Sequence, residues 1–287
     1  MIMLAKAQVL LGPEGQREKM FMPDPEKIAA LIRETAQAEI LPRFRMLGEG
    51  DIREKKPGDF VTAADLGAER RLTEQLTALA PGSLVLGEEA AAEDPARLGL
   101  LASEARVWVI DPVDGTANFA RGQPGFAVIL AEVQKGEVCA GWIYDPLEDV
   151  MVHALAGGGA WSAGQRLAVA GEVAAAELVG AAYGRTVTGL RAAKVLEASG
   201  RLGGVRNRGC SGLEYIDVAL GRAHFSLHSR SLPWDHAAGM LITAEAGGVA
   251  AFLDGSRYDP RIIDRPVLAS ASVTAWRTVQ EIVGALS

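Results

Sequence analysis

Cysteine and histidine, the residues that build disulfide frameworks and zinc sites, are scarce in this sequence. Its 287 residues include 2 cysteines and 4 histidines. Cys139 and Cys210 form no C-x-x-C motif, and the histidines show no H-E-x-x-H spacing, so a zinc site is not predicted. Two distant cysteines in apolar or glycine-rich surroundings are typical of inert thiols in a reducing compartment, so we expect a cytoplasmic protein.

Long apolar runs and basic clusters are missing as well. No run of 18 apolar residues occurs, so no membrane-spanning segment is predicted. The formal net charge is -7, and the densest group of arginines, within residues 201–208, holds only 3. A nucleic-acid surface needs a broader basic stripe than this. We therefore expect neither a membrane nor a nucleic acid as a partner.

The length and a hydrophobic content of 49% suffice for one large domain or two closely packed ones. Residues 1–23 contain a short apolar run without an A-x-A cleavage site, so we expect an N-terminal extension, ordered or disordered, rather than a secretory signal. Asp24 followed by Pro25 is typical of a helix start, where we expect the fold to begin. A change of hydrophobic pattern divides the rest into an α+β half, 24–165, and an α/β half, 166–287.

Hydrophobic periodicity distinguishes these two halves. Apolar residues at helical spacing predict a helix over 25–47 and a second helix from Thr62 or Asp65 to Leu79. Residues 125–169 show short apolar segments separated by turn residues, which predict antiparallel strands. Beyond about residue 170, strands alternate with helices, as is typical of layered α/β proteins.

One segment places two carboxylates at the end of a buried strand. WVIDPVDGTANF, residues 108–119, runs from apolar residues into Asp111 and Asp114. A turn needs one Asp and one Gly, so the second carboxylate requires a cation to offset the repulsion between the two. Further carboxylates follow strands or start helices, namely Asp65, Glu88 and Asp235. Carboxylate oxygens suit Mg²⁺, which takes about six oxygen ligands at about 2.0–2.1 Å.

The residues after this turn favour a phosphate, and no nucleophile motif fits the sequence. Gly115 and Thr116 begin a short predicted helix whose free N–H groups would face a bound anion. No arginine stands six residues after either cysteine, Pro112 replaces the first Asp of D-x-D-G-T, and Leu213 replaces the last Gly of G-x-S-x-G. We therefore predict attack on phosphorus by a metal-activated water.

These motifs resemble the signature segments of the inositol monophosphatase family, which are Mg²⁺-dependent, lithium-sensitive phosphomonoesterases. The matching segments, in family order, are DFVTAAD at 59–65, GEE at 87–89, WVIDPVDGTANF at 108–119 and PWDHAAGMLITAEAGG at 233–248. The similarity extends from about residue 25 to about residue 285. It implies an α/β (α+β) fold, a layered αβαβα sandwich of the inositol monophosphatase and sugar phosphatase type, and a homodimer.

The resemblance also implies a role for each matching residue. Two or three Mg²⁺ ions would be held by Glu88, Asp111, the carbonyl of Val113, Asp114 and Asp235. Asp65 and Thr116 would orient and deprotonate the attacking water, with Glu88 assisting through its metal. The substrate would contact Asp114, Gly115, Thr116, Ser211, His228 and Asp235. A family lysine ahead of the DFVT segment corresponds to Lys55 or Lys56, and the spacing leaves both open.

The substrate side departs from the family pattern at His228. Inositol-specific members carry a glutamate there, which accepts hydrogen bonds from a ring hydroxyl, whereas an imidazole donates or accepts them. The alternative interpretation of His228 is an exposed loop residue.

We expect hydrolysis of inositol-1-phosphate or a similar polyol phosphate. Histidinol phosphate, fructose-1,6-bisphosphate and a 3′-phosphonucleotide are the alternative substrates. An inactive regulatory binding protein is the non-enzymatic alternative, and the intact set of metal and catalytic residues disfavours it.

Overall fold

The computed structural model describes residues 24–56, 58–184 and 191–284. The N-terminal extension expected over residues 1–23 lies outside this part of the chain. Among the described helices, none has the length and apolar character needed to cross a membrane.

The first sheet has seven strands, in the order β3-β4-β5-β6-β7-β8-β9. The strands are β3 (Leu84–Gly87), β4 (Arg106–Asp114), β5 (Ala127–Gln134), β6 (Glu137–Asp145), β7 (Val150–Leu155), β8 (Gly159–Ser162) and β9 (Gln165–Arg166). β3 and β4 are parallel, and every later pair is antiparallel. The predicted antiparallel strands over 125–169 are therefore confirmed.

Two long helices cover one face of this sheet, namely α1 (Pro25–Thr35) and α2 (Ala63–Leu79). Their buried residues, such as Ile32 and Leu72, belong to one apolar cluster with Trp108 and Trp142 of the sheet. α1 is shorter than predicted, because its α geometry ends at Thr35. A π turn (Ala36–Ile40) and a 3-10 turn (Leu41–Arg43) follow, and the second contains Pro42, which has no N–H to donate.

Thr62 is the N-cap of α2, which settles the choice between Thr62 and Asp65 as the helix start. The Thr62 hydroxyl accepts from the N–H of Ala64, and the Asp65 carboxylate accepts from the N–H of Thr62. This reciprocal pattern is a capping box, which stabilises the first turn of a helix. The capping box also fixes the position of Asp65, which matters for the site described below.

The second sheet has five strands, in the order β11-β10-β12-β14-β13. The strands are β10 (Val179–Tyr183), β11 (Gly204–Arg206), β12 (Phe225–His228), β13 (Val249–Phe252) and β14 (Val267–Ser270). The helices of this half are α5 (Ala192–Ala198), α6 (Ser211–Ala219), α7 (Pro233–Glu245) and α8 (Val273–Gly284). The alternation of strands and helices predicted beyond residue 170 is therefore confirmed.

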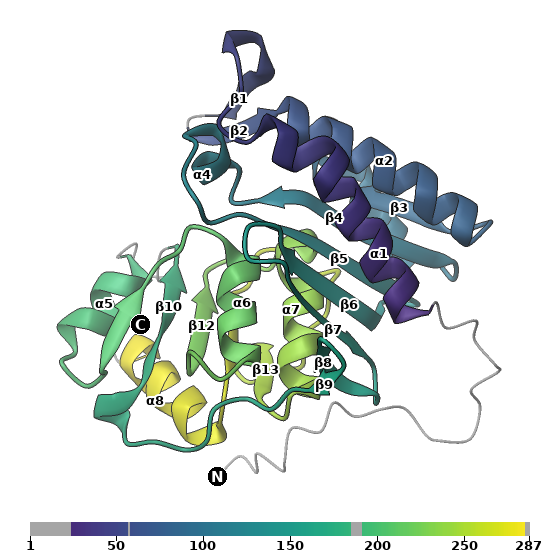
Figure 1. Cartoon of the computed structure of the whole chain (residues 1–287). Helices are drawn as coiled ribbons and strands as arrows, with labels where there is room; N and C mark the ends of the chain where they lie inside the picture. Colours follow the sequence, from purple (N-terminus) through teal and green to yellow (C-terminus); the bar gives the residue numbers. More distant parts are fainter. Residues whose placement is uncertain (1–23, 57, 185–190, 285–287) are drawn as a thin grey trace, which may run out of the picture.

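The elements form five layers, as Figure 1 shows. α6 and α7 lie between the two sheets, and their apolar side chains share a core with the first sheet. α5 and α8 cover the far side of the second sheet, with Trp276 and Leu196 in its outer core. The order of layers is α–β–α–β–α, as the sequence resemblance implies.

Three short elements lie near the edge where β3 and β4 end: the hairpin β1 (Ile52–Lys56) and β2 (Asp59–Thr62), the helix α3 (Glu88–Glu93) and the helix α4 (Thr116–Ala120). α3 follows directly from β3, and α4 follows β4 after one glycine. Because β3 and β4 are parallel, the residues that follow their carboxyl ends lie close together at this edge of the sheet.

Candidate active site

Three carboxylates from distant parts of the sequence meet at this edge. Glu88 begins α3, Asp111 lies near the end of β4, and Asp235 lies in the first turn of α7. One carboxylate oxygen from each lies within 4.8 Å of the other two. Because β3 and β4 are parallel and Gly87 pairs with Ile110, Glu88 and Asp111 leave the sheet side by side.

Asp111 and Asp114 flank an irregularity in β4. Asp111 pairs with Ile129 and Asp114 with Ala127 of β5, so the two residues between the aspartates face one residue of β5. Such a bulge bends a strand and redirects its side chains. The N–H of Val113 donates to Asp111 Oδ1 at 3.1 Å, which turns the strand further.

Gly115 connects this bulge to α4 in a conformation that only glycine adopts easily. Its φ is 88°, in the left-handed region. A Cβ atom at this position would also lie 2.5 Å from the carbonyl oxygen of Gly125. Any other residue would therefore displace Thr116, which follows it.

One oxygen of Asp114 is held by three donors from the other half of the chain. Oδ2 accepts from the N–H of Gly212 at 2.6 Å, the hydroxyl of Ser211 at 3.1 Å and the thiol of Cys210 at 3.0 Å. These donors lie at the start of α6, so the carboxylate connects the two halves. Ser211 is also placed 3.1 Å from the carbonyl oxygen of Asp235.

Burial and mutual repulsion make these carboxyl groups hard to ionise. Burial, opposed in part by Lys55, raises the pKa of Glu88 to about 7. Burial and then the neighbouring Glu88 and Asp114 raise the pKa of Asp111 and Asp235 well above the usual range. Removing water disfavours a charged group, and a second negative charge adds to that cost. A bound cation would offset both effects, so the donor set fits a hard divalent metal ion such as Mg²⁺.

Asp65 and Thr116 lie in contact beside this cluster. The Thr116 hydroxyl lies 3.2 Å from Asp65 Oδ1 and 2.9 Å from the carbonyl oxygen of Val113. Asp65 is 1% exposed, and burial raises its pKa to about 7, although the hydroxyl and N–H of Thr62 oppose the shift. A hydroxyl and a carboxylate with a pKa near neutrality are thus arranged for proton transfer.

Lys55, rather than Lys56, reaches the site. Its Nζ lies 3.2 Å from Glu88 and 3.0 Å from Glu89, while Lys56 is exposed. Burial opposes the positive charge, but the two glutamates outweigh it and raise the pKa of Lys55 above its ordinary value. Lys55 therefore supplies a fixed cation next to Glu88.

Sequence reasoning missed two further glutamates of this region. Glu89, the last residue of the GEE segment, is buried and accepts from Lys55 Nζ at 3.0 Å. Glu69 of α2 accepts from the N–H groups of Glu89 at 2.9 Å and Ala90 at 3.0 Å, so it caps the start of α3 and positions Glu88. The sequence feature that could have indicated Glu69 is its spacing, because it follows Asp65 by one turn of α2.

The cluster lines a cavity of about 450 Å³. Its lining includes all four acidic residues at positions 88, 111, 114 and 235, together with Gly115, Thr116 and Ser211. The lining also includes further residues of the second half, namely Tyr183, Asn207, Glu214, His228, Ser229 and Arg230. The structure thus brings the expected metal, catalytic and substrate residues to one cavity, apart from Asp65 and Val113, which contact the lining residue Thr116.

His228 is a buried residue of β12, so its interpretation as an exposed loop residue is wrong. It is 5% exposed and lines the cavity. Its Nε2 lies 2.7 Å from the hydroxyl of Ser226 and 3.3 Å from Glu214 Oε2. Glu214, which sequence reasoning also missed, is a buried carboxylate on α6 beside the position where the family pattern has its glutamate.

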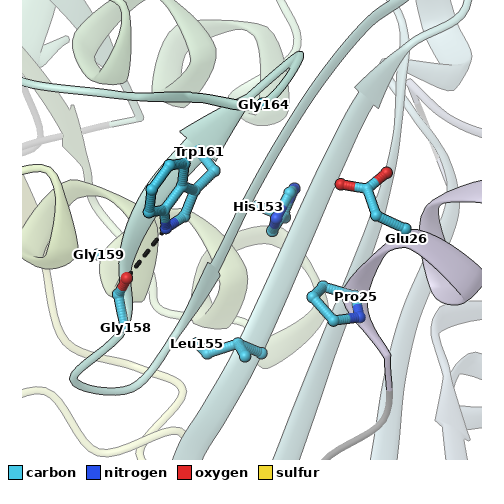
Figure 2. A pocket seen from close by; sticks show the side chains of 8 residues that line it. All are labelled: Pro25, Glu26, His153, Leu155, Gly158, Gly159, Trp161 and Gly164. Atoms are coloured by element: carbon cyan, nitrogen blue, oxygen red, sulfur yellow. Dashed lines mark hydrogen bonds between the residues drawn. The ribbon is translucent and has the colours of Figure 1, made fainter.

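A second hollow lies away from this site, between the start of α1 and the edge of the first sheet (Figure 2). Its volume is about 220 Å³, and its lining includes Pro25, Glu26, His153 and Trp161. The Trp161 indole donates to the carbonyl of Gly158 at 2.9 Å. Glu26 is the only carboxylate that lines it among the described residues, so it offers no comparable place for a metal ion.

The layered fold and the carboxylate cluster beside its cavity are the arrangement expected of a phosphatase that acts on phosphate monoesters. A model of the inositol monophosphatase family matches residues 25–286. The chain belongs to this family.

Several relatives are similar to this chain. An inositol-1-monophosphatase of Bacillus subtilis is 33% identical over 205 residues, covering 70% of this chain and 76% of that protein. A fructose-1,6-bisphosphatase/inositol-1-monophosphatase of Thermotoga maritima is 34% identical over 211 residues, covering 72% and 78%. The structure of an IMPase from Thermotoga maritima aligns with a TM-score of 0.77 at 28% identity, covering 93% of this chain and all of that one.

Proposed function

We propose that this protein hydrolyses a small phosphate monoester in a Mg²⁺-dependent reaction, with inositol-1-phosphate or a similar polyol phosphate as substrate. The observation that carries the proposal is the meeting of Glu88, Asp111 and Asp235 within 4.8 Å in a cavity. Two or three Mg²⁺ ions would be held by these residues, Asp114 and the carbonyl of Val113. When bound, the metal supplies positive charge that stabilises the phosphate and makes a water molecule more acidic.

The residues of the chain then perform the remaining tasks. The N–H groups of Gly115 and Thr116 bind phosphate oxygens at the end of the bulge. The Thr116 hydroxyl orients the attacking water. It donates its own proton to Asp65 and accepts the proton of the water in its place, and the raised pKa of Asp65, about 7, suits a base at neutral pH. Phosphoryl transfer needs little beyond such positioning and charge stabilisation. By analogy with the family, the active form is a lithium-sensitive cytoplasmic homodimer.

A sugar bisphosphate is a second candidate substrate. Arg121 and Arg230 line the cavity, and neither forms an ion pair with a described carboxylate. Arg121 lies over the Phe60 ring and Arg230 acts on Asp235, and together the two guanidinium groups would bind a second phosphate. The Thermotoga maritima relative whose name includes fructose-1,6-bisphosphatase makes this candidate testable alongside the first.

The experiment is a phosphate-release assay with inositol-1-phosphate, fructose-1,6-bisphosphate, histidinol phosphate and a 3′-phosphonucleotide, in Mg²⁺ and in chelator. We expect release only in Mg²⁺, with the polyol phosphate preferred, and a loss of about a hundredfold or more in Asp111→Asn. Asp264→Asn is the matched control, because Asp264 is exposed and does not line the cavity.

Two results would contradict the proposal. Equal activity of Asp111→Asn and Asp264→Asn would remove the metal assignment. No release from any of the esters would favour the inactive binding protein instead.

A further inference from the structure

A third hollow, beside the second sheet, differs in charge from the two described above. Its volume is about 240 Å³, and Gly180 and Ala181 of β10 contribute small residues to its lining. Three arginines also line it, namely Arg206, Arg208 and Arg222. Their charge is opposite to the formal net charge of the chain, which is -7. We call this hollow the arginine pocket.

The acidic residues of the arginine pocket do not balance its positive charge. Asp217 pairs with Arg208 at 2.8 Å and lies 3.8 Å from Arg222, so two guanidinium groups share one carboxylate. Arg206 is exposed and forms no ion pair with a carboxylate of the described residues. Burial raises the pKa of Glu214, the second acid of the lining, to about 8, so it adds little negative charge at neutral pH. Positive charge is therefore left over in the pocket.

The arrangement of the arginines favours a phosphate ion as the ligand. The three guanidinium groups come from the end of β11, the segment that follows it and the loop after α6. A guanidinium group presents planar N–H donors that match the oxygens of a carboxylate or a phosphate. Donors from three parts of the chain suit a tetrahedral dianion better than a planar carboxylate with a single charge. The hollow is also smaller than the clefts of about 300–1,000 Å³ that hold larger organic ligands.

A short segment belongs to both the arginine pocket and the catalytic cavity. Arg206 and Arg208 line the arginine pocket, whereas Asn207 and Gly209 line the catalytic cavity. Glu214 lines both, and its Oε1 accepts from the N–H of Arg208 at 3.2 Å. The two hollows therefore share this segment and Glu214 as a common boundary.

The contacts of Arg208 connect the two hollows further. Its carbonyl oxygen accepts from the side-chain amide of Asn118, which lines the catalytic cavity, at 2.9 Å. Its guanidinium group pairs with Asp217 of α6. The same helix begins at Ser211, which donates to Asp114. An anion that draws the Arg208 guanidinium away from Asp217 would therefore act on the shared segment and on the catalytic cavity.

We propose that the arginine pocket binds an inorganic phosphate ion, and that this ion changes the rate of turnover in the catalytic cavity. The site is separate from the one that binds the phosphate of the substrate, because its three arginines do not line the catalytic cavity. Only the description of phosphate as the reaction product rests on the function proposed above. Such a site would let the concentration of free phosphate regulate the enzyme.

Two of the arginines can be changed without altering the lining of the catalytic cavity. Arg206 and Arg222 are exposed, so the double variant Arg206→Gln/Arg222→Gln removes two charges from the pocket and leaves Arg208 in place. Arg201→Gln/Arg277→Gln is the matched control, because these two arginines are also exposed and line neither hollow.

The first measurement is calorimetric titration of inorganic phosphate into the full-length protein in chelator. We expect wild type and the control to bind one phosphate with a Kd of about 1 mM or below, and the double variant to bind it at least about tenfold more weakly. No saturable binding to wild type, or equal binding by all three proteins, would overturn the proposal. Because this readout needs no turnover, it can fail or succeed separately from the proposed phosphatase activity.

The second measurement is the dependence of kcat on phosphate concentration in Mg²⁺, with a saturating amount of the ester that the phosphate-release assay identifies. Saturating substrate displaces phosphate from the catalytic cavity, so a change in kcat that the double variant lacks reports the arginine pocket. We expect phosphate to change kcat by about fivefold in wild type and in the control, and to leave kcat of the double variant constant. Equal phosphate dependence in wild type and the double variant would contradict the effect on turnover.

Discussion

Removal of the metal should make the folded protein progressively less stable as the pH rises. The reason is that Glu88, Asp111 and Asp235 all have a raised pKa in the folded state. A carboxyl group of this kind holds its proton more tightly when folded than when unfolded. Its stabilising contribution is complete below its ordinary pKa and is lost as the pH rises through the folded one, which is about 7 for Glu88.

The size of the effect follows from the same shift. The pKa of Glu88 changes from 4.5 to about 7, and each pKa unit corresponds to about 1.4 kcal/mol. Glu88 alone therefore changes the free energy of unfolding by about 3 kcal/mol at most over this pH range, because its side chain is 21% exposed and partly screened by solvent. The neighbouring carboxyl groups titrate together with it, so the contributions do not simply add. For a chain of this length we expect a change in melting temperature of about 5 °C.

The assay is thermal unfolding between about pH 5 and about pH 8.5, in chelator and in Mg²⁺, for wild type, Glu88→Gln and Asp264→Asn. In chelator, wild type and Asp264→Asn should lose about 5 °C relative to Glu88→Gln over this range, because that variant lacks the carboxyl group whose pKa is raised. Mg²⁺ should restore wild type and Asp264→Asn and have little effect on Glu88→Gln. Parallel pH curves for wild type and Glu88→Gln in chelator would refute the reasoning.

Three further substitutions test single contacts. Lys55→Met should cost about 2–3 kcal/mol in urea unfolding because it leaves two glutamates without their cation, while Lys56→Met, at an exposed position, should change stability by less than about 0.5 kcal/mol; equal losses would contradict the assignment of Lys55. Thr116→Ala should lower kcat by about 100-fold or more with little change in KM, and Thr116→Ser should retain most of the activity, as steady-state kinetics would show. Gly115→Ala should destabilise more than Gly82→Ala, because both glycines have a φ near 85–88° but only Gly115 meets a carbonyl oxygen at 2.5 Å; indistinguishable urea midpoints would remove that argument.

The parts of the fold that depend on neighbouring residues could be predicted from the sequence. The helix α2 is an example, since the sequence placed its start at Thr62 or Asp65, which contact each other within one helical turn. Turn residues likewise predicted the antiparallel strands of the first sheet. The end of α1 could not be predicted so closely, because apolar spacing continues through the π and 3-10 turns that replace α geometry after Thr35.

The candidate site shows the same limit. Asp111 and Asp114 could be predicted as site residues, because two carboxylates at the end of a buried strand repel each other unless a cation lies near them. Glu69 and Glu214 do not form such a pair, since each lies within a helical pattern and acts on groups that only the folded chain brings near. The choice between Lys55 and Lys56 also required the irregular pairing of the β1–β2 hairpin between Glu54 and Lys56, which sequence spacing does not determine.

The three donors on Asp114 Oδ2 have a consequence for how the molecule moves. Asp114 ends a strand of the first sheet, whereas Cys210, Ser211 and Gly212 begin a helix that packs between the sheets. Separation of the two halves would break all three bonds at once. The amide hydrogen of Gly212, bonded at 2.6 Å, therefore exchanges with solvent only when this junction opens. Its exchange rate reports how often the catalytic cavity comes apart in the folded protein.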